Sequence, residues 1–144
     1  MYRIEKTKIS EVYKMTSKPR GYCIIINIIN FTGNKFEERN DSVDNVCMIK
    51  SAFENLHFSV ITYYDLEYKD IFSYLNELTK KQECDNHDAF VLYIGSHGEE
   101  EGFIASNNKV ISYNEIIDVF SDIKCKKFIK KPKLILFDCC RGGY

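Results

Sequence analysis

The stretch GYCIIINIINF, residues 21–31, is a nearly unbroken apolar run rich in β-branched side chains. Such a run is typical of a β-strand that is buried on both faces, as in the centre of a parallel sheet. The polar lead-in before it, residues 1–20, contrasts with residues 21–144, which show no linker or internal repeat. We therefore expect one domain over residues 21–144, preceded by a short lead-in.

Strands and helices alternate along the rest of the chain. In the first expected helix, Val46, Ile49, Phe53 and Leu56 recur at helical spacing. The expected elements after the first strand are, in order, a helix over 42–56, a strand over 57–63, a helix over 65–82, a strand over 89–95, a hairpin around Asn107-Asn108, a helix over 113–120 and a strand over 133–138. This alternation predicts an α/β fold with a mostly parallel, twisted sheet, helices on both faces and a small hairpin.

Composition and charge exclude several classes of protein. Apolar residues make up 44% of the chain, as in ordinary globular domains, and the formal net charge is −1. No overall field therefore attracts nucleic acid or an anionic membrane, and we expect neither as a partner. The charged N-terminus does not resemble a signal peptide, and no apolar run is long enough to span a membrane, so we expect a cytoplasmic protein.

Six cysteines are more than a domain of this size needs. They form no CxxC pair, so we expect neither a metal site nor a cofactor. Four of them are expected to be inert thiols: Cys23, Cys47, Cys84 and Cys125. Cys139 is expected to be structural, with redox sensitivity as the alternative. His57 and His87 carry no motif and are expected at the surface.

Three polar segments follow predicted strands, at the carboxyl edge where α/β sheets carry their sites. They are Arg39 after the first strand, Ser96-His97-Gly98 after the third, and Cys139 to Gly143 after the fourth. A histidine and a cysteine on neighbouring strand ends can act as base and nucleophile. Glycine there allows backbone N–H groups to approach a substrate carbonyl, so the pattern indicates acyl transfer.

SHGEE (96–100) and KPKLILFDCCRGG (131–143) resemble the histidine and cysteine signatures of caspases. SKPRGYCIIINIINF (17–31) and SAFENLHFSV (51–60) are similar to the start of initiator-type caspase domains. The resemblance implies the three-layer α/β/α sandwich of a caspase large subunit and a cysteine endopeptidase that acts in apoptosis or related signalling and cleaves after an acidic residue. It makes Cys140 the nucleophile and His97 the general base and acid. It also implies an oxyanion hole formed by the N–H groups of Gly98 and Cys140, with Arg39 holding the substrate aspartate.

The sequence departs from the family pattern beside the nucleophile. Asp138 stands where the family has a glutamine that binds the substrate aspartate, and Cys139 stands where it has alanine. Two carboxylates in one pocket repel each other, which would weaken a preference for aspartate. Alternatively, Asp138 forms a salt bridge with Arg39. The loop after Arg39, residues 40–44, is about one residue shorter than the family's.

The resemblance also implies partners, since the chain stops at Tyr144, where caspase domains continue into a small subunit. We expect a processed large subunit, an expressed fragment or a natural truncation. Its last strand would leave a sheet edge for a small subunit, and a second caspase-like protomer would complete the assembly. One alternative to a peptidase of protein substrates is an impaired homologue, a decoy that regulates an active caspase. Another is a non-proteolytic α/β binding module.

Overall fold

A four-stranded parallel sheet forms the centre of the molecule, in a computed structural model that describes residues 12–140. The strand order is β2-β1-β3-β6. The strands are β1 (Tyr22–Asn27), β2 (Ser59–Tyr64), β3 (Phe90–Ser96) and β6 (Lys133–Cys139). Every residue of β1 and β3 is buried, as their apolar sequences predict for inner strands.

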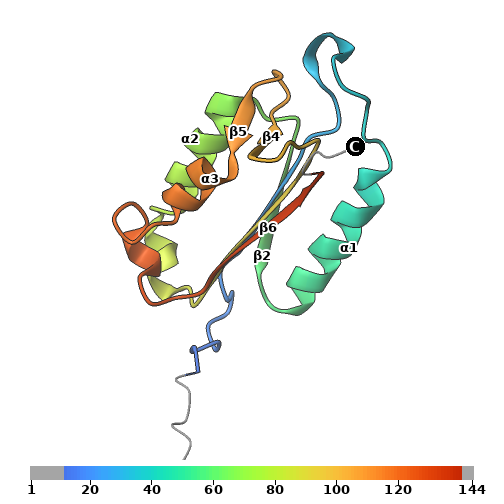
Figure 1. Ribbon diagram of the computed structural model, residues 1–144. Coiled ribbons are helices and arrows are strands. Elements are labelled where there is room, and N and C mark those ends of the chain that lie inside the picture. The colour runs from blue at the N-terminus through green and yellow to red at the C-terminus, as the bar shows by residue number, and fades with distance from the viewer. Residues whose placement is uncertain (1–11, 141–144) are drawn as a thin grey trace, which may run out of the picture.

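Helices cover both faces of this sheet (Figure 1). Helix α1 (Ser42–Asn55) packs on one face through Val46, while α2 (Tyr68–Leu78) and α3 (Tyr113–Val119) pack on the other. A hairpin of β4 (Gly102–Ile104) and β5 (Val110–Ser112) lies at the carboxyl end of the sheet. The predicted three-layer α/β/α architecture with a small hairpin is confirmed. None of the helices in residues 12–140 has both the length and the hydropathy to cross a membrane.

The first strand is shorter than the apolar run that predicted it. It ends at Asn27, four residues before Phe31, although Ile28 and Phe31 are still buried in the core. The chain leaves the sheet there because the backbone N–H groups of Ile29 and Asn30 donate to Asp65 Oδ1 instead of continuing the ladder. The apolar run thus predicted which residues are buried, but it did not predict where the pairing of β1 ends.

All three predicted helices are also shorter in the structure, α3 by one residue. Helix α1 ends at Asn55, and Leu56 behind it is 48% exposed instead of packing on the sheet. The helix predicted from Asp65 begins at Tyr68, because the Asp65 carboxylate binds the loop that follows β1. After Leu78 the chain forms a separate 3₁₀ turn at Gln82–Asn86. The predicted apolar face of this second helix, Ile71, Leu75 and Leu78, is buried as expected.

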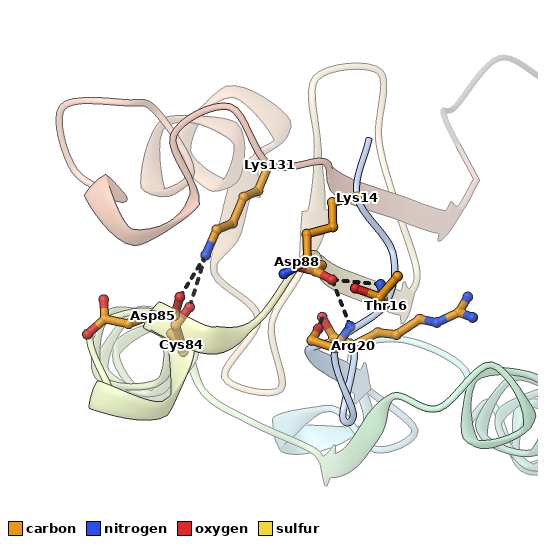
Figure 2. Close-up of polar contacts among 8 residues, drawn as sticks. Lys14, Thr16, Arg20, Cys84, Asp85, Asp88 and Lys131 are labelled. Atoms are coloured by element: carbon orange, nitrogen blue, oxygen red, sulfur yellow. Dashed lines mark hydrogen bonds and ion pairs between the residues drawn. The ribbon is translucent and has the colours of Figure 1, made fainter. Parts of the chain in front are cut away.

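The amino end of the sheet is closed by the segment that precedes β1. The buried Asp88 carboxylate accepts hydrogen bonds of 2.8 Å from the backbone N–H group of Thr16, as Figure 2 shows, and from that of Ser17, and it pairs with Lys14. The Arg20 carbonyl in turn accepts the N–H groups of Asp88 and Ala89. Nearby, Lys131 Nζ donates to the carbonyls of Cys84 and Asp85 (Figure 2).

The expectation that His87 lies at the surface is wrong. It is 4% exposed, its ring meets the edge of Tyr22 at 5.1 Å, and its Nδ1 is buried without a hydrogen-bond partner. Burial lowers the pKa of His87 because the charged imidazolium would lose its hydration. The polar loop sequence around it gave no sign of this, since the contact with Tyr22 of β1 forms only in the folded chain.

Candidate active site

His97 lies directly after β3, with its ring among aromatic side chains. The ring centroids of Phe31 and Phe36 are 5.1 and 5.9 Å from that of His97. Its Nε2 is 2.7 Å from the carbonyl oxygen of Glu37. Because a carbonyl oxygen can only accept, Nε2 donates its proton in this contact, and in the neutral ring Nδ1 is then the nitrogen with the lone pair. His97 is therefore held in the tautomer that can take a proton at Nδ1.

Gly98 and Cys140 meet where two neighbouring strands end. A Cβ placed on Gly98 would lie 2.2 Å from the Cys140 carbonyl oxygen and 2.8 Å from Cys139 Cβ, so only glycine fits here. The hydrogen bonds that hold the Gly98 loop are made by the N–H groups of Glu99 and Ile104, which leaves the Gly98 N–H for another acceptor. The Cys140 side chain is exposed. The loop histidine and the cysteine motif are thus in contact through their backbones.

Arg39 reaches the same edge from the loop between β1 and α1. Its Nη1 donates to Asn27 Oδ1 at 3.0 Å and to the Ile28 carbonyl at 2.7 Å. Its own carbonyl accepts from Ser42, the first residue of α1, which ties the backbone of Arg39 to the helix. Despite the shorter loop that follows it, Arg39 is fixed at both ends. The structure thus brings together the three segments that the sequence placed at this edge, as far as Cys140.

Asp138 lies in β6, two residues before Cys140, and its side chain is exposed. Its Oδ2 accepts a 2.6 Å hydrogen bond from the Tyr93 hydroxyl. The alternative in which Asp138 forms a salt bridge with Arg39 is wrong, because no ion pair joins these two described residues. Burial, and then the nearby carboxylate, raise the pKa of Tyr93, so its hydroxyl keeps the proton that it donates.

The remaining cysteines differ from Cys140 in their exposure. Cys23, Cys84 and Cys125 are buried, and burial raises the pKa of Cys23 to about 12 and that of Cys84 to about 11. Burial also raises the pKa of Cys139 to about 11, and its Sγ faces the Ile94 carbonyl. Cys47 is exposed on α1. Among the described residues no group of three potential metal ligands is present. Arg141, Gly142 and Gly143 lie outside the described residues.

Three contributors to this site were not found from the sequence. Asn27 holds Arg39, Tyr93 holds Asp138, and the Glu37 carbonyl holds His97. Asn27 left one signal, since it is a polar residue inside an otherwise apolar run. The Glu37 contact comes from a backbone atom, which any residue type could supply.

Strand β6 forms one border of the sheet. It pairs with β3 on one side, and within residues 12–140 no strand pairs with its other side. Leu134 in this strand is 47% exposed. A strand with a free row of N–H and C=O groups is a template for a further strand.

Comparisons with known proteins identify the family of this chain. The caspase domain family model matches residues 20–144. The chain is 29% identical to caspase-8 of Mus musculus, covering 96% of this chain and 30% of that protein. It is 30% identical to caspase-3 of Xenopus laevis and 33% identical to caspase-7 of Gallus gallus, over 95% and 91% of this chain and 49% and 42% of theirs. The chain spans less than half the length of these relatives, and it belongs to the caspase domain family.

Proposed function

We propose that residues 21–144 are the large-subunit domain of a caspase-type cysteine endopeptidase, with Cys140 as nucleophile and His97 as base. The observation that carries this proposal is the close packing of the Gly98 backbone against Cys140, beside a histidine whose Nδ1 is free to accept a proton. An exposed thiol, a base and a free N–H group are the parts that acyl transfer needs.

The reaction would proceed through an acyl-enzyme. His97 Nδ1 takes the proton of Cys140 Sγ, and the sulfur attacks the peptide carbonyl carbon. The N–H groups of Gly98 and Cys140 bind the resulting oxyanion. His97 then gives its proton to the departing amine, the C–N bond breaks, and water later hydrolyses the thioester with His97 again as base.

The substrate would be a protein cleaved after an acidic residue. The Arg39 guanidinium is the group that would hold this side chain, because Nη1 is anchored while Nε and Nη2 bind no described residue. Asp138 counteracts that preference through its negative charge. We place this activity in apoptosis or a related signalling pathway, and in the cytoplasm, where thiols stay reduced.

Activity would require a partner chain. The unpaired side of β6 supports a small subunit that adds a strand there, and a second caspase-like protomer would complete the assembly. The exposed Leu134 is a side chain that such a strand would cover.

The experiment uses the complete protein, including the segment that supplies the small subunit. We expect it to cleave members of a peptide library and a thiol alkylator to modify Cys140, while Cys140→Ser abolishes both. The matched control is Cys47→Ser, which removes another exposed thiol and should leave cleavage unchanged. Absence of cleavage together with absence of a Cys140 adduct would refute the proposal.

The presence of Asp138 supports a second candidate, an impaired homologue that binds an active caspase and regulates it. Here Asp138→Gln is informative, since it replaces the carboxylate with an amide. A large gain in cleavage after aspartate would favour the impaired homologue. Good parental activity that the substitution leaves unchanged would exclude it.

A further inference from the structure

Asp138 belongs to a row of three residues at the carboxyl edge of the sheet. In register, Asn27 of β1 lies beside Gly95 of β3, and Gly95 lies beside Asp138 of β6. Directly paired residues of parallel strands point to the same face, which here is the α1 face. The glycine in the middle has no side chain, and Asn27 Oδ1, the Tyr93 ring and Arg39 Nη2 lie around the place where its Cβ would project.

Arg39 lies across this row. A Cβ on Gly95 would come within 3.5 Å of Arg39 Nη2 and within 2.7 Å of Asn27 Oδ1. Since Nη1 is bound to Asn27 and to the Ile28 carbonyl, the guanidinium is fixed, and Nη2 still has protons to donate. The row therefore presents an oriented hydrogen-bond donor.

The same row presents an oriented acceptor. Oδ2 of Asp138 is held by the Tyr93 hydroxyl at 2.6 Å, and Oδ1 binds no described residue. Because Arg39 and Asp138 form no ion pair, neither group neutralises the other by direct contact. Both belong to the edge that carries Cys140, two residues beyond Asp138.

A side chain that enters between these groups meets a donor and an acceptor. A carboxylate would bind Arg39 but be repelled by Asp138. An ammonium group would bind Asp138 but be repelled by Arg39. A primary amide has a carbonyl oxygen for Arg39 and an NH₂ group for Asp138. We propose that this site accepts asparagine in preference to aspartate at neutral pH, so that the enzyme also cleaves after asparagine. This inference rests on the proposed peptidase function.

The test compares two peptide substrates that differ only in asparagine or aspartate before the scissile bond. These side chains have nearly the same shape, so the ratio of their kcat/KM values reports charge and hydrogen bonding. With the complete protein at pH 7.5 we expect the asparagine/aspartate ratio to exceed one. Asp138→Asn should lower this ratio by roughly tenfold or more, because it removes the repulsion of the substrate carboxylate.

Three further measurements separate this inference from other effects. Asp70→Asn, which removes a carboxylate from the first turn of α2 on the opposite face, should leave the ratio unchanged. Tyr93→Phe keeps the ring but frees Asp138, and should reduce the ratio less than Asp138→Asn does. Calorimetric binding of two product peptides that end in asparagine or aspartate reads the site without catalysis.

The outcomes distinguish the inference from the proposed function. Tighter binding of the asparagine peptide, lost in Asp138→Asn, supports the asparagine preference of the site even if nothing is cleaved and Cys140 resists alkylation, in which case the proposed function fails and with it only the cleavage after asparagine. A preference for aspartate in the parent, in both cleavage and binding, would overturn the inference while leaving the peptidase intact.

Discussion

The two ends of the same parallel sheet differ in how their polar groups are used. At the amino end, Asp88 binds two backbone N–H groups, and the Arg20 carbonyl accepts two more. At the carboxyl end, the Gly98 N–H, His97 Nδ1 and the Cys140 thiol bind no other group among residues 12–140. The amino end therefore holds the chain together, and the carboxyl end carries the groups that the proposed reaction would use.

The two ends of the sheet differ because different segments flank the strands there. The lead-in segment contacts the residues directly before β3, where the Asp88 carboxylate and the Arg20 carbonyl accept backbone N–H groups (Figure 2). Over the carboxyl ends, the loop after β1 and the hairpin rise on either side of the sheet (Figure 1), and they orient side chains without covering Cys140. Substitutions at the carboxyl end should therefore affect activity, and those at the amino end should affect stability.

The largest effect is expected from removing the nucleophile. Cys140→Ala should lower kcat/KM of the complete protein by about 10⁴-fold or more, because no other exposed described thiol lies at this edge. The melting temperature should stay near that of the parent, since Cys140 is exposed. Peptidase activity that survives in the purified variant would place the reaction elsewhere.

Gly98→Ala should lower kcat/KM by about 100-fold, the usual effect of losing an oxyanion donor. The added Cβ would lie 2.2 Å from the Cys140 carbonyl oxygen and must displace one of the two backbones. Steady-state kinetics measure the loss, and alkylation of Cys140 checks that the thiol remains accessible. Unchanged kinetics would show that this contact does not position the reacting groups.

At the amino end, Asp88→Ala should lower the free energy of unfolding by about 1–3 kcal/mol, because two N–H groups lose a charged acceptor. Alkylation of Cys140 should proceed at the parental rate. The control is Asp122→Ala, which breaks an exposed ion pair with Lys133 and should cost less than about 1 kcal/mol. If urea denaturation gave equal losses of stability for Asp88→Ala and Asp122→Ala, the hydrogen bonds of Asp88 would not stabilise the amino end of the sheet.

The smallest effect is a pH dependence of stability from His87. Burial lowers its pKa, so below an ordinary imidazole pKa of about 6.5 the folded chain binds fewer protons than the unfolded chain. The contribution of His87 is present above that pH and is lost as pH falls toward the lowered pKa. Nearby charges also act on the pKa of His87, which is raised by Glu83 and Asp88 and lowered by Lys131.

Urea denaturation at pH 7.5 and 5.5 measures this contribution. His87→Asn should reduce the pH dependence, whereas His57→Asn, at an exposed histidine, should leave it as in the parent. Identical pH dependences in the parent and His87→Asn would mean that His87 is hydrated in the folded chain.

Much of the fold could be predicted because periodicity reports burial. The apolar run at β1 predicted an inner strand, and the spacing of Ile71, Leu75 and Leu78 predicted the buried face of α2. Element boundaries were less accurate, since they depend on contacts distant in sequence. Asp65, for example, binds the backbone after β1 instead of beginning α2.

The sequence by itself determined the parallel α/β order, and with it the edge where Arg39, His97 and Cys140 meet, because parallel strands end on one side of a sheet. Only the tertiary structure decided how the side chains there are held. Asp138 pairs with Tyr93 rather than Arg39, and Glu37 fixes the proton of His97. His87 is buried although its local sequence is polar. Such pairings depend on which segments approach in space, and local residue patterns do not encode them.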